Sequence, residues 1–227
     1  GHAHAGRVRG VGRRGRAVTH RYRWVSWNRH KRVYDAAVVA AIVVGVGAFA
    51  GAGVILADAP PDPAALLIRA LGSTAFVLLH VVLCIGPLAR LTDLMNPVLY
   101  NRRHLGVATF LVALAHAALV FAYYGGFGET DPVTAVLFLH RSLGSIETFP
   151  FELLGFAGLL VLFALAATSH DFWLAQLSPS VWKALHMGVY GAYALLVAHV
   201  CLGSLRDGGT GGFWATLAGV VVVGALH

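Results

Sequence analysis

The stretch VWKALHMGVYGAYALLVAHVCLG, residues 181–203, decides the fold, because it is apolar enough to cross a membrane and carries two histidines, His186 and His199. A histidine inside a bilayer is costly unless it is hydrogen-bonded or bound to a metal. The thirteen-residue spacing places the two rings roughly 19 Å apart along one helix. That is the separation of two haem irons stacked across a bilayer. Matching histidines on a parallel helix would give each iron two imidazole ligands.

The composition is that of an integral membrane protein. Of the 227 residues, 58% are hydrophobic and 12% are charged, which is more apolar sequence than a soluble domain of this length can bury. A membrane span needs about 20 apolar residues. Five apolar stretches meet this length and a sixth is shorter, which predicts an all-α membrane protein with six transmembrane helices. The stretches cover residues 34–57, 65–90, 105–124, 151–169, 181–204 and 212–227.

Basic residues are concentrated before the first apolar stretch. Ten of the seventeen Lys and Arg residues lie between Arg7 and Arg32 and account for most of the formal charge of +7. Because cytoplasmic segments carry the excess of basic residues, we expect the N-terminus in the cytoplasm, and the third and fifth spans then run parallel. Residues 1–33 are predicted to be a basic arm that contacts anionic lipid or a partner subunit, not nucleic acid. Residues 34–227 form the transmembrane domain, and a bacterial inner membrane is the expected location.

The intramembrane histidines fall at two depths. His104 and His186 lie within about 5 Å of the cytoplasmic interface, whereas His116 and His199 lie roughly 20 to 24 Å from it. We therefore expect two pairs that join the third span to the fifth: an outer pair, His116 with His199, and an inner pair, His104 with His186. Helical phase separates His104 from His116 by about 120°. His104 is accordingly either a ligand or an interfacial histidine beside the neighbouring arginines.

Other polar residues in or near the spans can serve the same cofactor. His80, in the second span, can replace a ligand, hydrogen-bond a haem edge, or hydrogen-bond a neighbouring carbonyl. Haem propionates need cationic or hydrogen-bonding partners. Arg69 can serve an outer haem or extend to the outer headgroups. On the cytoplasmic side Arg90 and Arg103 can serve an inner haem or anchor the chain at the interface.

Four motifs, in this order along the chain, resemble the ferric reductase-like transmembrane domain family. The closest pattern is that of the haem-binding membrane subunits of periplasmic methionine sulfoxide reductase systems, and the resemblance covers approximately residues 65–205. It implies a haem-binding helical bundle. The motifs are IGPLARL at 85–91, NRRHLGVATFLVALAHAALV at 101–120, LAATS at 165–169 and WKALHMGVYGAYALLVAHV at 182–200.

The resemblance assigns His116, His186 and His199 to haem, while His104 falls where these reductase subunits usually have a non-ligating residue. The basic arm is a departure from the pattern, and we expect no flavin or nicotinamide domain within residues 1–227. We expect a b-type cytochrome with one or two haem b groups, the electron-transfer component of a larger redox system. A quinone or flavin site near the cytoplasmic ends of the spans is left open. The alternative is a structural or regulatory subunit of a respiratory or photosynthetic membrane complex that retains the fold.

Overall fold

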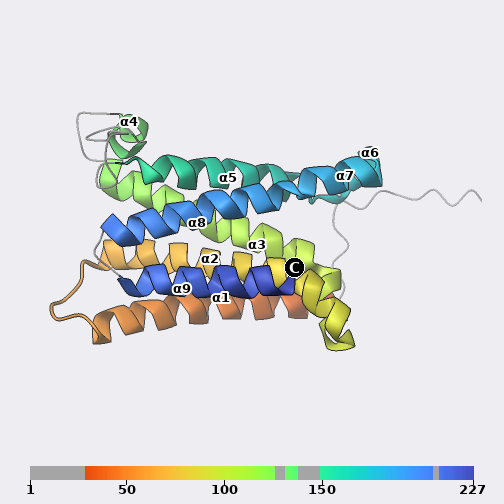
Figure 1. Cartoon of the computed structure of the whole chain (residues 1–227), viewed down its shortest axis with the longest axis horizontal. Coiled ribbons are helices and arrows are strands. Elements are labelled where there is room, and N and C mark those ends of the chain that lie inside the picture. The colour runs from red at the N-terminus through yellow and green to blue at the C-terminus, as the bar shows by residue number, and fades with distance from the viewer. Residues whose placement is uncertain (1–28, 126–130, 138–148, 207–209) are drawn as a thin grey trace, which may run out of the picture.

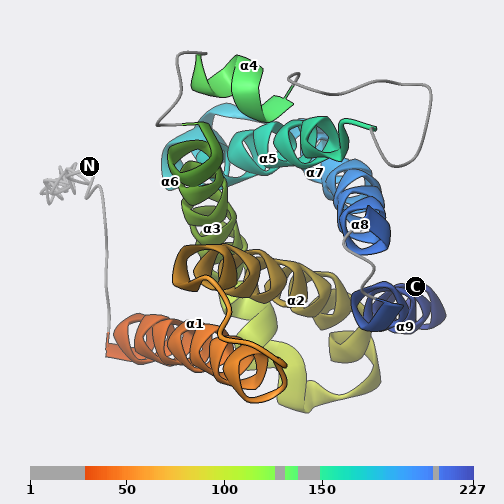
Figure 2. The same ribbon diagram turned by 90° about the vertical axis from the view of Figure 1, so that its left-hand side faces the viewer.

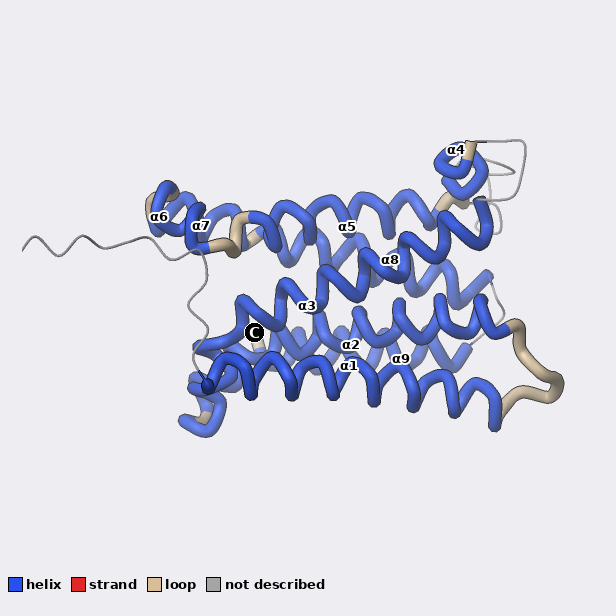
Figure 3. Tube along the Cα trace, turned by 180° about the vertical axis from the view of Figure 1, so that it is seen from behind, coloured by secondary structure: helices blue, strands red, loops and turns tan. Residues whose placement is uncertain are grey.

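The computed structural model describes residues 29–125, 131–137, 149–206 and 210–227, and all regular structure in these ranges is helical. The long helices run side by side along one axis (Figure 1), and helices make up most of the described trace (Figure 3). The all-α prediction is therefore confirmed. The long helices are α1 (Arg29–Ile55), α2 (Pro63–Leu91), α3 (Asn96–Val120), α5 (Phe151–Ala167), α8 (Gly188–Arg206) and α9 (Thr210–Leu226).

Short helical elements lie at the two ends of the bundle. A 3₁₀ turn precedes α3 and a π-helical turn follows it, and three short α-helices lie in the connections on either side of α5. The apolar stretch 181–204 is interrupted at Met187, where one helix ends and α8 begins after it. The short elements are Asp93–Met95 (3₁₀), Phe121–Gly125 (π), α4 (Pro132–Leu137), α6 (Asp171–Gln176) and α7 (Pro179–His186).

Five of the long helices form a closed ring of contacts. The helix α2 packs against α3, α3 against α5, α5 against α8, α8 against α9, and α9 returns to α2. Figure 2, which looks along the bundle, shows this order, with α1 outside the ring against α2. The third and fifth apolar stretches therefore both contribute to the ring, through α3 and α8, and α1 lies outside it.

The helix ends are set by local sequence. Asp62 caps α2 by accepting a hydrogen bond from the Ala65 backbone N–H at 2.8 Å, and Pro63, which has no N–H to satisfy, occupies the first turn. Ser178 and Pro179 repeat this arrangement at the start of α7. These Asp-Pro and Ser-Pro pairs mark where α2 and α7 begin.

The interior holds two clusters of buried apolar side chains. One cluster joins residues from every helix of the ring, among them Leu79 of α2, Leu162 of α5 and Ala192 of α8. The other joins α2 to α3, with α1 packed against it through Val38 and Ile42. Many other large apolar side chains point outward, as expected for helices that face lipid.

Four helical segments in the described ranges are long and apolar enough to cross a membrane: Lys31–Ile55, Pro63–Leu91, Asp93–Tyr124 and Pro179–Arg206. The helices α5 and α9 have 17 residues each and are shorter than this criterion. The prediction of several membrane-spanning helices is thus supported by length and composition, while the count of six stays a prediction. Residues 1–28 of the predicted basic arm lie outside the described residues.

Candidate functional site

The outer pair, His116 and His199, is held by bonds that cross between helices. His116 on α3 has its Nδ1 2.8 Å from the carbonyl oxygen of Ile68 on α2. His199 on α8 has its Nδ1 2.9 Å from the carbonyl oxygen of Phe151 on α5. Because a carbonyl oxygen can only accept, each Nδ1 must carry the proton and donate. Each neutral ring therefore keeps its lone pair on Nε2.

The two outer rings are partly buried. Within the described residues, no hydrogen-bond partner contacts Nε2 of either ring. Each ring also lies against a glycine of the facing helix, Gly72 for His116 and Gly155 for His199. The outer pair thus presents two unengaged ring nitrogens from two helices of the ring.

The predicted inner pair is held differently. His104 Nδ1 lies 3.0 Å from a carboxylate oxygen of Asp35 on α1, and both side chains are about one-third exposed. His186 donates from Nδ1 to the carbonyl oxygen of Trp182 in its own helix, at 3.0 Å, and its Nε2 lies 3.3 Å from the Ser169 hydroxyl. None of the described contacts joins His104 to His186. The contacts favour the interfacial alternative for His104, and inner-pair ligation stays a prediction.

His80 has both ring nitrogens engaged. Its Nδ1 donates to the carbonyl oxygen of Phe76 at 2.8 Å, and its Nε2 accepts from the Tyr193 hydroxyl at 3.1 Å. The Tyr193 ring also meets the His80 ring edge to face at 5.2 Å. These contacts favour the hydrogen-bonding alternative for His80 over ligation. Tyr193 was not anticipated from the sequence, because a bond to a residue 113 positions away leaves no local pattern.

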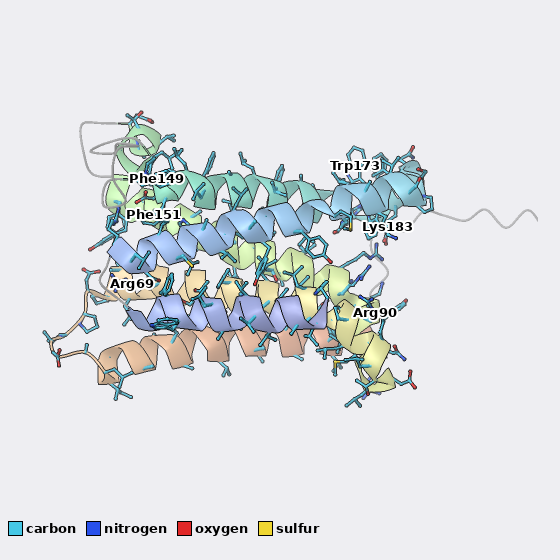
Figure 4. All side chains as sticks on the ribbon, viewed as in Figure 1. Arg69, Arg90, Phe149, Phe151, Trp173 and Lys183 are labelled. Atoms are coloured by element: carbon cyan, nitrogen blue, oxygen red, sulfur yellow. The ribbon has the colours of Figure 1, made fainter. Side chains whose placement is uncertain are left out.

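The arginines lie at opposite ends of the bundle. Figure 4 shows Arg69 at the end where α2 begins, which is also the end that holds Phe151, and Arg90 and Lys183 at the other end. This agrees with their assignment to the two sides of the membrane. Arg103 bonds the carbonyl oxygen of Ser169 at 3.4 Å and Asp171 at 3.2 Å, which ties α3 to the start of α6. A propionate-binding role for any of these arginines stays a prediction.

A further ion pair, missed by the sequence analysis, lies beside His199. Arg206 at the end of α8 contacts Glu152 in the first turn of α5 at 3.3 Å, and its guanidinium lies 4.6 Å from the centre of the Phe151 ring. The pair joins α8 to α5 next to the Phe151 carbonyl that accepts the hydrogen bond of His199. A carboxylate at the start of an otherwise apolar stretch was the available signal.

The available side chains fit a pair of histidine ligands to a haem iron better than a site in which three or more side chains bind a metal ion. Among the described residues, no group of three or more His, Cys, Asp or Glu side chains gathers as a bare metal ion would require. Two histidines with lone pairs on Nε2 match the axial needs of a haem iron. The fold and this site together define a helical-bundle membrane protein that presents paired histidines from two helix hairpins.

The chain belongs to the family described as ferric reductase like transmembrane component, whose model matches residues 71–197, more than half of the chain. The resemblance inferred from the motifs is therefore confirmed. The matched segment contains all four histidines of interest on α2, α3 and α7 but ends two residues before His199. It excludes α1, and with it Asp35.

Curated proteins of two kinds are similar to the chain. The "Protein-methionine-sulfoxide reductase heme-binding subunit MsrQ" of Ralstonia nicotianae is 32% identical over 61% of the chain and 58% of the relative. The subunit of the same name from Caulobacter vibrioides is 32% identical over 62% of each. The "Magnetosome protein MamZ" of Magnetospirillum gryphiswaldense is 31% identical over 65% of the chain and 21% of the relative. The chain thus spans less than two thirds of these relatives.

Proposed function

We propose that the chain is a b-type cytochrome that carries electrons across a membrane, with a haem held between His116 and His199. The observation that carries this proposal is the matched pair of Nδ1 hydrogen bonds, because it fixes both rings in the tautomer that leaves Nε2 available. Histidines that bind metals commonly donate their other ring N–H to a carbonyl in this way. The MsrQ relatives are named as heme-binding subunits, which supports the same cofactor.

A haem bound there would supply an iron that gains and loses one electron. The chain's own residues do the rest. The carbonyls of Ile68 and Phe151 hold the protons at Nδ1 and fix the ring orientations. The surrounding apolar helices exclude water, and this burial sets the dielectric that tunes the reduction potential. Arg69, which shares the outer end, is the proposed propionate partner.

The same proposal covers a second, inner haem and its surroundings. His186 would supply one ligand, since its Nδ1 also donates to a carbonyl and the single hydroxyl hydrogen of Ser169 already has Leu165 O as an acceptor at 2.8 Å. Arg90 and Arg103 would face inner propionates. His104 and a quinone or flavin site at this end remain part of the prediction.

The chain would work as a module of a larger redox system. Electrons would enter from a partner protein, a quinol or a further domain. We further propose that α5 and α9 complete six transmembrane helices, with residues 1–33 as a cytoplasmic basic arm and residues 34–227 as the haem domain in a bacterial inner membrane. The basic arm would contact lipid headgroups or a partner subunit.

The test is a dithionite-reduced minus oxidised spectrum of the purified full chain, with a pyridine haemochrome assay that counts haem b per chain. His116→Leu and His199→Leu are expected to lose the outer haem. His80→Leu is the matched control, because it removes another intramembrane histidine whose Nε2 is engaged by Tyr193, and it should keep that haem. A wild-type chain without haem, or equal loss from all three variants, would overturn the proposal and favour a structural subunit.

A further inference from the structure

The two hairpins of the ring repeat one arrangement around a histidine. In the hairpin of α2 and α3, His116 donates to the carbonyl oxygen of Ile68, and Gly72 lies one helical turn further along α2. A Cβ placed on Gly72 would lie 3.0 Å from both Cε1 and Nδ1 of His116. The carbonyl that accepts the hydrogen bond and the glycine that faces the ring therefore lie on the same face of α2.

The hairpin of α5 and α8 has the same three parts at the same spacings. His199 donates to the carbonyl oxygen of Phe151, and Gly155 lies four residues further along α5. A Cβ on Gly155 would lie 2.8 Å from Cε1 and Nδ1 of His199. In both hairpins the histidine follows its carbonyl partner by 48 residues. The two hairpins thus share the same arrangement of histidine, backbone carbonyl and glycine.

The spacing explains why the second residue is glycine. Residues i and i+4 of a helix lie one above the other on the same face. A ring that donates to the carbonyl of residue i must therefore pass over residue i+4, and any side chain there would occupy the space of the ring. Real Cβ atoms do not approach heavy atoms closer than about 3.0 Å, so a larger residue would push the ring away from the carbonyl.

We propose that Gly72 and Gly155 are positioning residues for the two haem-ligating histidines. By leaving room for the ring, each glycine lets a backbone carbonyl fix the Nδ1–H tautomer and aim Nε2 into the bundle. This inference rests on the proposed function. It also predicts an asymmetry, because the three nearest ring atoms lie at 2.8, 2.8 and 3.1 Å from a Cβ at Gly155 and at 3.0, 3.0 and 3.5 Å from one at Gly72.

Other glycines of the same helices provide matched controls. Gly158, also on α5, would bring a Cβ to 2.9 Å from the Leu196 side chain of α8, so it tests hairpin spacing without touching a histidine. Gly191, on the helix of His199, has no heavy atom within 4 Å of a built Cβ among the described residues. Alanine there should be harmless, because alanine favours the helix over glycine.

The experiment compares Gly155→Ala, Gly72→Ala, Gly158→Ala and Gly191→Ala in the full chain. We expect Gly155→Ala to lower haem affinity by about ten-fold or more, the effect typical of a lost outer partner of a metal ligand. It should also shift the low-spin EPR signal and let the reduced haem bind CO. Gly72→Ala should do the same to a smaller degree. Gly158→Ala should lower the unfolding temperature with an unchanged EPR signal, and Gly191→Ala should match the wild type.

The inference is overturned if Gly155→Ala keeps the wild-type EPR signal and excludes CO, or if Gly158→Ala shifts the signal equally. A second measurement separates this from failure of the proposed function. In apoprotein with ¹⁵N-labelled histidine, NMR should show His199 as the Nδ1–H tautomer, and Gly155→Ala should remove that preference. A wild type without haem would overturn the cytochrome, while an unchanged tautomer in Gly155→Ala would overturn the positioning role alone.

Discussion

The outer and inner ends of the bundle hold their histidines by different kinds of contact. At the outer end, His116 and His199 each donate to a carbonyl on the facing helix of a hairpin, so each ring is fixed relative to two helices. At the inner end, His186 donates to its own helix and His104 to a carboxylate of α1. The outer contacts therefore join the two helices of each hairpin, whereas one inner contact stays within α7 and the other reaches α1, outside the ring.

The largest expected effect separates the two ends by haem content. His186→Leu should remove at most a haem bound at the inner end and should leave the outer haem in place. His104→Leu should leave the haem content unchanged, because its ring is engaged by Asp35. Pyridine haemochrome analysis of the purified variants provides the measurement. If His104→Leu lost as much haem as His186→Leu, the two would form the inner pair that the sequence suggested.

A smaller effect is expected between the two ends, where Tyr193 donates to His80. Tyr193→Phe removes the donor and leaves His80 Nε2 unsatisfied in an apolar interior. Interhelical hydrogen bonds in membrane proteins contribute about 0.6 kcal/mol on average and about 1.7 at most. We expect thermal unfolding in detergent to shift down accordingly, with an unchanged haem spectrum.

Tyr190→Phe is the control for this change, because Tyr190 is 40% exposed and no described contact involves its hydroxyl. It should leave the unfolding temperature unchanged. Loss of haem in Tyr193→Phe would instead mean that the contact with Tyr193 orients His80 as a haem ligand. Haem binding would then involve a third position between the two ends.

At the inner end, Asp35→Ala should have a modest effect that depends on salt. The Asp35–His104 contact is one-third exposed on both sides, and such pairs contribute at most about 1 kcal/mol. Added salt screens exposed charges. The unfolding temperature of Asp35→Ala should therefore fall below that of the wild type at low ionic strength and approach it at high ionic strength. If the unfolding temperature of Asp35→Ala stayed below that of the wild type at high salt, Asp35 would stabilise the fold through the packing of α1 and not through its charge.

Much of the fold follows from the sequence because the apolar stretches are long. The second span is predicted over 65–90 and observed as the helix Pro63–Leu91. The pairing of His116 with His199, inferred from their depth, stays a prediction. The sequence analysis treated residues 181–204 as one continuous span. In the structure, α7 begins after the Ser178 cap and ends at His186, and α8 begins after Met187. The span predicted to end at residue 169 ends at Ala167, where a capping turn takes over.

The parts of the site that could not be predicted are tertiary. A backbone carbonyl carries no signature of the histidine that will donate to it 48 residues later, so Ile68 and Phe151 were invisible in the sequence. Gly72 and Gly155 resemble any other helix glycine until the ring that faces them is known. The contact between His104 and Asp35 was hidden in the sequence, because the position of a residue along a helix does not reveal which neighbouring helix its ring will meet.

The smallest expected effect concerns the outer end and is set by pH. The backbone N–H of Ala65, with a lesser contribution from the Tyr123 hydroxyl, holds the pKa of Asp62 below its ordinary value. A carboxylate with a lowered folded-state pKa stabilises the fold above its unfolded-state pKa of about 3.9. That stabilisation is lost as the pH falls through the folded-state pKa. Asp62 caps α2, and Ile68 lies only six residues beyond it.

Acidification should therefore loosen the first turns of α2 and, through the Ile68 carbonyl, the orientation of His116. Asp62→Asn keeps an N-cap side chain but does not titrate in this range. The unfolding temperature of the wild type relative to Asp62→Asn should be highest near neutral pH and should fall below about pH 4. Asp131→Asn, which changes a similar cap on α4, should not alter this pH dependence of the unfolding temperature. If Asp62→Asn and Asp131→Asn changed the pH dependence equally, the Asp62 cap would have no specific role in stabilising the outer end.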